Sequence, residues 1–259
     1  MKREEDGVPA VSVITVVKDH LSGLKDTYAS LLEQDFTNWQ MIIIDGQSND
    51  GTLIMARELA LKDARVRVEE QVSVGIYGAM NEGISLANSE FSWFMNAGDK
   101  FATPSAMNHA IAQIFGGSLG VVVGGYQIEI ENAFKTYKFS NKELTPLNFA
   151  FNRRGGCHQA MIFRTKKLVE LGGYDTSYAL ASDFDLVLKV IMESGGKRIP
   201  EVLARIEPGG RSDQGIHIVH KEKHAIRNNL IGGLKVIIAS FVWTFLVRAK
   251  IMLRRLFNK

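Results

Sequence analysis

Runs of apolar residues recur along the chain, and most are followed by a polar stretch and a helical pattern. The runs at 11–17 and 39–45 lack the alternation of a half-exposed strand, so each predicts a strand buried on both faces. Apolar residues at helical spacing follow them, up to about Glu33 and Lys62. This alternation of strands and helices predicts right-handed parallel crossovers in an α/β domain.

The same kind of pattern continues to residue 206. It predicts strands at 66–68, 91–95, 119–123, 158–163 and 198–206, the last of them an edge strand, and helices that begin at Ser22, at Ser48 or Asp50, at Gly75, at Thr103 and at Ser182. Residues 126–139 alternate more strongly and predict an antiparallel excursion from the sheet.

The first candidate for function is the loop after the strand at 39–45. That strand ends in Asp45, and the glycines Gly46 and Gly51 lie in the loop that leads into the next helix. Ligands of parallel sheets bind beyond the carboxyl ends of the strands, so we expect Asp45 beside a ligand. An aspartate that only shapes the turn is the alternative.

Composition indicates an ordinary globular protein. The 259 residues are 46% hydrophobic and 23% charged, which suits one full α/β domain with a small appendage. The single cysteine, Cys157, excludes an internal disulfide and fits a reducing compartment. Residues 1–7 are charged and lack an apolar segment, so we expect no signal peptide.

Charge is distributed unevenly, although the net charge is only +3. Nine Lys or Arg and one acid lie in 221–259, which gives this segment +8 and leaves the rest with −5. The acidic body argues against nucleic acid as a partner. Residues 230–247 are mostly apolar but borderline in length for a membrane span, so we expect a basic amphipathic helix on an anionic membrane surface. Packing of this helix on the domain or on a second subunit is the alternative. We therefore divide the chain into a domain at 1–216 and a helical tail at 217–259.

Four further features follow one another in a recognisable order. They are 11–15 leading into 44–52, then 75–83 (Gly-Ile-Tyr-Gly-Ala-Met-Asn-Glu-Gly), 96–99 (Asn-Ala-Gly-Asp) and 181–186 (Ala-Ser-Asp-Phe-Asp-Leu). Together they resemble family-2 glycosyltransferases of the GT-A fold, over roughly residues 11–215. The resemblance implies a Rossmann-like, mixed but mostly parallel sheet flanked by helices. It also implies inverting transfer of a sugar from a nucleotide-diphosphate donor.

The resemblance places the donor site at the strand ends. It implies that Asp45 recognises the base and ribose, which suits a carboxylate because it accepts hydrogen bonds from N–H and O–H groups. Thr15, Asn81 and Gly98 belong to the same nucleotide site by resemblance. Asp99 would hold Mn²⁺ or Mg²⁺, which stabilises the diphosphate leaving group. The family usually has two neighbouring acids there, and Gly98 stands in place of the first. A turn aspartate is the alternative interpretation of Asp99.

By the same resemblance, Asp183 is the catalytic base that takes the proton of the acceptor hydroxyl. Helical periodicity supports this choice, since Asp183 shares the expected buried face with Val187. Asp185 has a structural explanation instead, because it can pair with Lys189 at i+4 and close a capping box with Ser182. A helix-dipole role in the first turn is the alternative for Asp183.

Two basic residues are candidates for contacts with phosphate or acceptor. His158 can donate a hydrogen bond to a phosphate or a sugar hydroxyl, and a purely structural histidine is equally compatible with the sequence. Arg211 lies in a glycine-rich loop at 209–215 that could close over the donor phosphates, since flexible loops often act as lids.

We therefore expect a metal-dependent inverting hexosyltransferase, with a UDP-sugar as the default donor and a lipid-linked saccharide as acceptor, in bacterial surface-polysaccharide biosynthesis. The expected location is the cytoplasm, at the inner face of the cell membrane. The sequence leaves open whether the protein forms a homo-oligomer. One alternative is a non-catalytic nucleotide-sugar-binding component of a polysaccharide assembly complex, which Gly98 favours. The other is a nucleotidyltransferase, which would need a glycine-rich loop where Lys18, Asp19 and His20 stand.

Overall fold

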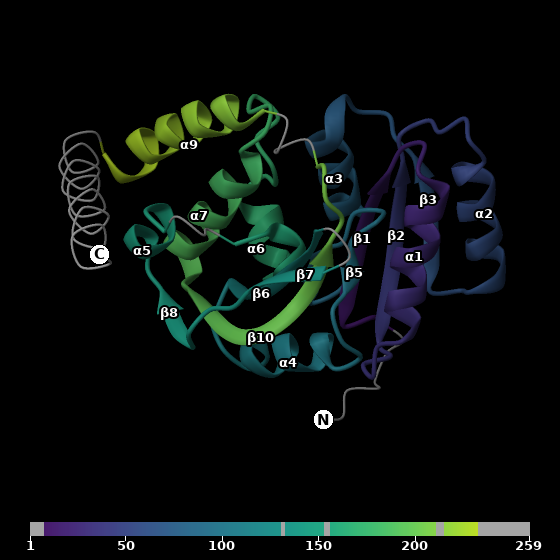
Figure 1. Cartoon of the computed structure of the whole chain (residues 1–259), viewed down its shortest axis with the longest axis horizontal. Coiled ribbons are helices and arrows are strands. Elements are labelled where there is room, and N and C mark those ends of the chain that lie inside the picture. The colour runs from purple at the N-terminus through teal and green to yellow at the C-terminus, as the bar shows by residue number, and fades with distance from the viewer. Residues whose placement is uncertain (1–7, 131–132, 153–155, 211–214, 233–259) are drawn as a thin grey trace, which may run out of the picture.

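Strands and helices alternate through the first half of the chain, as the apolar runs predict (Figure 1). The computed structural model describes residues 8–130, 133–152, 156–210 and 215–232. In this half the elements are β1 (Val11–Val17), α1 (Leu21–Leu32), β2 (Trp39–Asp45), α2 (Thr52–Lys62), β3 (Val66–Glu70), α3 (Gly75–Leu86), β4 (Phe91–Phe94), β5 (Lys100–Phe101) and α4 (Ala106–Ile114).

The second half begins with antiparallel strands and ends in helices. Its elements are β6 (Val121–Ile130), β7 (Ala133–Tyr137), β8 (Lys142–Leu144), α5 (Pro146–Ala150), η1 (His158–Ala160), β9 (Met161–Arg164), α6 (Thr165–Glu170), α7 (Ser182–Ser194), β10 (Gly196–Ile206) and α9 (Ile216–Ile231). β6 and β7 pair antiparallel, which confirms the predicted excursion at 126–139. Only the second half of the strand predicted at 158–163 is extended, because it begins as the turn η1.

The ten strands of the described residues form one mixed sheet. Its order is β3-β2-β1-β4-β9-β6-β10-β5, with β7 paired to β6 and β8 paired to β10. β1 is parallel to β2 and to β4, and β2 is parallel to β3. β9 is antiparallel to both of its neighbours, while β10 is parallel to β6. The predicted fold class, a Rossmann-like mixed sheet flanked by helices, is confirmed.

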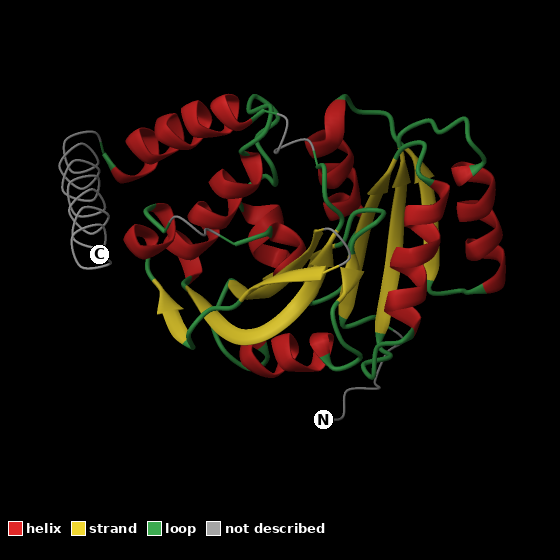
Figure 2. Ribbon diagram, in the orientation of Figure 1, coloured by secondary structure: helices red, strands yellow, loops and turns green. Residues whose placement is uncertain are grey.

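Helices cover both faces of the sheet (Figure 2). Leu24 of α1 and Met107 of α4 belong to the buried apolar cluster on one face, and Met80 of α3 and Leu186 of α7 belong to the cluster on the other. β1 is buried at every position, and β2 is buried at every position except Gln40. Cover on both sides explains why these strands have continuous apolar runs instead of alternating ones.

The edge strand predicted at 198–206 is wrong, because β10 lies inside the sheet. β6 borders it on one side, and the short strands β5 and β8 border it on the other. These two partners have two and three residues, too few to show a strand pattern in the sequence. Complete burial of Leu203 and Ala204 agrees with the interior position.

Helices lie where the sequence predicts them, but their first residues differ. α1 begins at Leu21 without a side-chain cap, so Ser22 lies inside its first turn. α2 begins at Thr52, whose N–H donates to Asp50 at 3.0 Å although the glycine between them is the N-cap. Residues 103–104 lie in the turn before α4, not at its start. Helix ends are decided by local contacts that periodicity does not report.

α9 packs on the rest of the structure. It contacts α7 and α5, and its residues Val219 and Ile226 are buried. The Nε of Arg227 donates to the carbonyl oxygen of Ala150 at 2.8 Å. This first part of the basic segment therefore lies against the domain.

The predicted division at 216 and 217 falls at the first residues of α9, and it stays a prediction. Most of the predicted amphipathic tail, residues 233–259, lies outside the described residues. Within the described ranges, no helix combines the length and the apolar character that a membrane crossing requires.

Gly83 sets how closely α3 approaches β1, because a Cβ at this position would overlap Cγ2 of the fully buried Ile14. We expect Gly83→Ala to lower the free energy of unfolding by about 1–3 kcal/mol, since the overlap outweighs the roughly 1 kcal/mol that alanine gains in a helix. Urea denaturation measures the change. Ser85→Ala, at an exposed position of the same helix, is the control and should alter stability by less than about 0.5 kcal/mol. A stabilised Gly83→Ala variant would contradict this close packing.

Candidate active site

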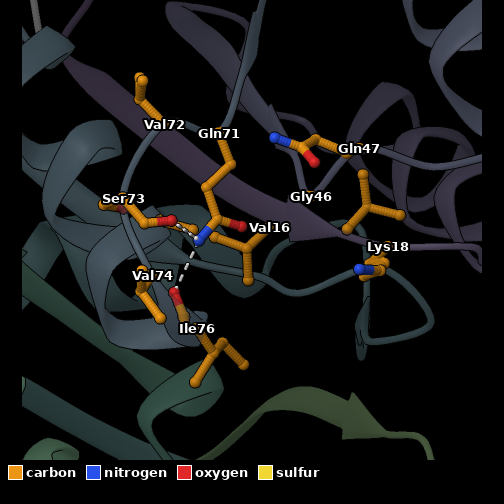
Figure 3. A pocket seen from close by; sticks show the side chains of 12 residues that line it. Val16, Lys18, Gly46, Gln47, Gln71, Val72, Ser73, Val74 and Ile76 are labelled. Atoms are coloured by element: carbon orange, nitrogen blue, oxygen red, sulfur yellow. Dashed lines mark hydrogen bonds between the residues drawn. The ribbon is translucent and has the colours of Figure 1, made fainter.

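The carboxyl ends of β1, β2 and β3 and the start of α3 enclose a cavity of about 560 Å³ (Figure 3). Lys18, Gly46 and Gln47 line it on the side of β1 and β2, and residues 71–75 with Ile76 line it on the side of α3. Open α/β sheets bind their ligands at this position, outside the carboxyl ends of the strands.

The loop at 71–75 is held by hydrogen bonds from two side chains. The amide nitrogen of Gln71 donates to two carbonyl oxygens of the loop, each at 2.8 Å (Figure 3). The carboxylate of Glu82, on α3, accepts the N–H of Val72 at 3.1 Å and that of Ser73 at 2.6 Å. These bonds give this wall of the cavity a defined shape.

Asp45 ends β2 opposite Val17 of β1, and the next residue, Gly46, lines the cavity. Asp45 is fully buried, and its Oδ1 accepts the N–H of Ser48 at 2.8 Å, which is the turn-shaping role. Among the described residues, neither its Oδ2 nor the hydroxyl of Thr15 on β1 has a hydrogen-bond partner. Buried polar atoms are seldom left unpaired, so these two atoms are available to a ligand if the loop after Asp45 opens.

A second cavity, of about 580 Å³, adjoins the first, since Val16, Lys18 and Ile76 line both. Asp99 and His158 line this second cavity. They come from the loop after β4 and from the turn before β9, and they meet because β4 and β9 are neighbours in the sheet. The structure thus brings two of the candidate residues together in one cleft.

Asp99 is almost completely buried, with 4% of its surface exposed. Its Oδ1 accepts the backbone N–H of Glu207 at 2.9 Å, and its Oδ2 accepts the side-chain amide of Gln159 at 2.7 Å. Burial raises the pKa of Asp99 to about 6, because these hydrogen bonds offset the loss of hydration only in part. Each oxygen accepts one hydrogen bond and keeps a further lone pair.

Gly98 has φ +97°, in the left-handed region that glycine adopts without strain. Its N–H donates to the hydroxyl of Thr27 at 3.0 Å. A Cβ at this position would overlap the carboxylate of Glu207, whose Oε1 lies 3.5 Å from Nε2 of His20. The space above Gly98 is therefore occupied by the carboxylate of the residue that follows β10.

Asp183 and His158 form a pair, with 3.7 Å between Oδ2 and Nδ1. Burial raises the pKa of Asp183, but the neighbouring His158 and the more distant Lys223 outweigh burial, and the pKa lies below its usual value. The second ring nitrogen of His158, Nε2, is buried without a hydrogen-bond partner in the part of the chain that the structure describes. His158 thus connects Asp183 to the cavity that Asp99 lines.

The burial predicted for the two acids of α7 is reversed. Asp185 is 2% exposed, whereas the side chain of Asp183 is 29% exposed. The predicted pair is present, with 2.6 Å between Asp185 and Nζ of Lys189. The capping box is absent, because the helix has no side-chain cap and the hydroxyl of Ser182 has no hydrogen-bond partner among the residues that the structure describes. α7 contacts α5, α6, α9 and β6, so more than one face is enclosed and periodicity cannot rank the acids.

The backbone before α7 is held from α9. The carboxylate of Glu222 accepts the N–H groups of Ala179, Leu180 and Ala181 at 2.7, 2.9 and 2.9 Å. Two of these residues, Ala179 and Leu180, line the second cavity. The one acid of the basic segment therefore helps to place the start of the helix that carries Asp183.

The structure does not bring Asn81 to the cleft. Its amide donates to the carbonyl of Tyr174 at 2.8 Å and accepts the N–H of the same residue at 2.7 Å, so both polar groups are occupied. Arg211 lies outside the described residues. Gly209 and Gly210, immediately before it, line the second cavity.

Sequence reasoning missed Glu207 and Gln159, which bind Asp99, and His20, which contacts Glu207. Glu207 follows β10 directly, so the signal that singled out Asp45, an acid at a strand end, could have found it. Gln159 belongs with His158 to a segment that resembles the acceptor side of the family, but its bond to Asp99 and the contact of His20 depend on the order of the strands.

The profile described as Glycosyl transferase family 2 matches residues 12–172, more than half of the chain. The chain belongs to this family. An uncharacterized glycosyltransferase of Mycobacterium tuberculosis is 26% identical over 233 residues, which cover 86% of this family-2 glycosyltransferase and 82% of the relative. A PGL/p-HBAD biosynthesis glycosyltransferase of Mycobacterium bovis is 24% identical over 182 residues, or 70% of this chain and 69% of that one.

Solved structures share the fold of this family-2 glycosyltransferase at low sequence identity. Residues 1–349 of S. aureus TarS, in complex with UDP-GlcNAc, match with a TM-score of 0.67 at 16% identity, covering 85% of this chain and 66% of that one. The mannosyltransferase PcManGT from Pyrobaculum calidifontis, in complex with GDP-Man and Mn²⁺, matches with a TM-score of 0.62 at 17% identity, covering 93% and 81%. These likenesses confirm the predicted GT-A fold.

His158 is the first residue to test, because its ring lowers the pKa of Asp183. We expect His158→Gln to raise the pKa of Asp183, since the imidazole interactions that oppose the effect of burial are then lost. Carbon NMR of the carboxyl groups measures the pKa, with Asp183→Asn identifying the signal. His109→Gln, at an exposed position on α4, is the control and should leave the pKa unchanged. An Asp183 pKa that stays the same or falls in His158→Gln would contradict the pairing.

Proposed function

We propose that this glycosyltransferase moves a sugar from a UDP-sugar to a saccharide acceptor, with inversion at the anomeric carbon. The observation that supports it best is the adjoining pair of cavities, the first beside Asp45 and the second lined by Asp99 and His158. Each has a volume typical of a small-molecule site. The first suits the nucleoside and the second suits the diphosphate, the sugar and the acceptor.

Uridine is the proposed base, with guanosine as the alternative. S. aureus TarS has been solved with UDP and with UDP-GlcNAc, whereas PcManGT has been solved with GDP-Man. In the proposal, Asp45 and Thr15 bind the nucleoside through the buried oxygens that have no partner among the described residues. Gly98 stays a proposed member of the nucleotide site, next to Asp99 and beneath the carboxylate of Glu207. Asn81 supports the site indirectly through the backbone of Tyr174.

Asp99 is the proposed ligand of Mn²⁺ or Mg²⁺. A carboxylate that lines the cavity and keeps a lone pair on each oxygen fits a hard divalent cation. Such cations often use one or two carboxylates together with substrate phosphates and water. Across the described residues, no cluster of three or more His, Cys, Asp or Glu side chains could hold a metal ion alone. A bound cation would stabilise the negative charge of the departing diphosphate.

Asp183 is the proposed base. Its lowered pKa keeps the carboxylate ionised at neutral pH, ready to accept a proton. It takes the proton of the acceptor hydroxyl while that oxygen bonds to the anomeric carbon, and the bond from this carbon to the diphosphate oxygen breaks on the opposite face. His158 orients the carboxylate through Nδ1 and has Nε2 left for a phosphate or the acceptor. Arg211, after the glycines of the second cavity, is proposed to contact the donor phosphates.

A lipid-linked saccharide is the proposed acceptor, and surface-polysaccharide biosynthesis is the proposed context. The Mycobacterium bovis relative is named for PGL/p-HBAD biosynthesis, and another relative, from Bacillus subtilis, is the putative glycosyltransferase EpsH, 29% identical over 128 residues. The charge of +8 in 221–259 supports a peripheral position on an anionic membrane at the cytoplasmic face. This peripheral position is compatible with a homo-oligomer.

The non-catalytic alternative rests on Gly98, which removes one of two acids expected by resemblance. The ionised Asp183 paired with His158 argues for catalysis, because a binding protein has no need of a base beside the second cavity. The nucleotidyltransferase alternative has no support from the membership of the chain in glycosyltransferase family 2.

A panel of nucleoside diphosphates with Mn²⁺ tests the donor. We expect UDP to raise the melting temperature most, because at equal concentration the nucleotide that binds most tightly stabilises the folded state most. A ligand at one hundred times its Kd contributes roughly 2.7 kcal/mol. Asp45→Asn should reduce the shift with UDP, and Asp35→Asn, at an exposed position, should not. A larger shift with GDP would replace uridine by guanosine, and no shift with any nucleotide would contradict the proposed donor site.

Replacement of Asp183 tests the base. We expect Asp183→Asn to slow sugar transfer by roughly 10²–10⁴-fold, while the affinity for the donor changes little, because the amide cannot accept the proton. A radiolabelled donor measures transfer, and calorimetry measures binding. Glu193→Gln, an exposed change on the same helix, is the control. Transfer at the full rate in Asp183→Asn would exclude this residue as the base.

A further inference from the structure

Gly98 and Glu207 occupy one small space at the edge of the cleft. Gly98 has a backbone angle that disfavours side chains, and a Cβ there would overlap Oε2 and Cδ of Glu207. Glu207 comes from the end of β10, far from Gly98 along the chain. Its carboxylate therefore lies where an acid at position 98 would begin.

A hydrogen bond to Asp99 also holds the backbone of Glu207 in this part of the cleft. Its N–H donates to Oδ1 of Asp99 at 2.9 Å, so the two acids are joined by a direct hydrogen bond. Both residues line the second cavity. The side chain of Glu207 is 47% exposed, which leaves its oxygens accessible from the cleft.

We propose that Glu207 supplies the second carboxylate of the cation site, in place of the acid that position 98 lacks. The inference rests on the proposed function, in which Asp99 holds Mn²⁺ or Mg²⁺ at the donor diphosphate. The protein ligands of the cation are then two carboxylates from loops that follow different strands, Asp99 after β4 and Glu207 after β10. Divalent cations of this kind often use one or two carboxylates together with substrate phosphates and water.

Contact with His20 is the competing explanation for Glu207. Nε2 of His20 lies 3.5 Å from Oε1 of Glu207, and the His20 ring lies over Gly23 in the first turn of α1, where a Cβ would overlap it. A single contact at this distance engages one oxygen. Oε2, the oxygen beside Gly98, is not engaged by this contact with His20 and can bind a cation. The two roles are therefore compatible, and an experiment has to separate the cation role from a purely structural one.

Binding of UDP to the full chain, measured by calorimetry with Mn²⁺ and again with EDTA, separates them. With Mn²⁺, we expect Glu207→Gln to weaken UDP binding by about tenfold or more, the scale of losses seen when groups around a metal are changed. With EDTA, the same variant should bind UDP as tightly as the wild type or more tightly, because one negative charge beside the diphosphate has been removed. Paramagnetic resonance of Mn²⁺ in the presence of UDP gives a direct second measurement of cation affinity.

Glu201→Gln is the matched control, since Glu201 lies on β10 and lines a different cavity. It should leave both affinities unchanged. Equal weakening with and without Mn²⁺ in Glu207→Gln would assign Glu207 a structural role only and overturn the inference. Unchanged binding under both conditions would overturn it as well.

The wild type and Asp99→Asn distinguish this inference from the proposed function. If Mn²⁺ strengthens UDP binding in the wild type but not in Asp99→Asn, the assignment of Asp99 to the metal stands. The result for Glu207→Gln then tests only whether Glu207 is the second carboxylate ligand. If Mn²⁺ does not strengthen UDP binding in the wild type, the metal assignment and the role of Glu207 both fail, although UDP binding itself would keep the proposed donor.

Discussion

Parallel pairing of β1 with β2 and β4 is the constraint on which the site depends. It brings the carboxyl ends of these strands together, so Val17 lies opposite Asp45 and the loop that carries Asp99 follows the strand on the other side of β1. β9 then pairs antiparallel with β4 and places the turn with His158 at the same end. Residues from four separate segments lie at one end of the sheet because these strand ends are aligned, and ligands of α/β sheets bind at such ends.

Burial of acids is the recurring electrostatic feature of the cleft. Asp45 is fully buried, with one oxygen unpaired within the described part of the chain, and the pKa of Asp99 is raised to about 6 by loss of hydration. Asp183 differs, since a basic neighbour compensates for burial and keeps its pKa low. The three acids therefore have three environments. Groups with different environments are suited to different tasks within one reaction.

α9 connects the basic segment to the chemistry of the cleft. Its Glu222 binds three successive backbone N–H groups before α7, and its Arg227 lies over the rings of Phe151 and Phe184. These contacts fix the start of the helix that carries Asp183. An element that sequence alone divides from the domain thus contributes to the geometry of the site.

The sequence by itself determined the alternation of strands and helices, the fold class and the strand ends that carry Asp45 and Asp99. These features are local, because a continuous apolar run and a polar loop with glycines report how one segment is buried. Only the tertiary structure decided that β10 is interior, that Asp185 is more buried than Asp183, and that Asn81 binds the backbone of Tyr174. Only it brought Glu207 to Gly98 and His158 to Asp183. Those contacts join residues distant in sequence, and periodicity within a segment has no information about which strands become neighbours.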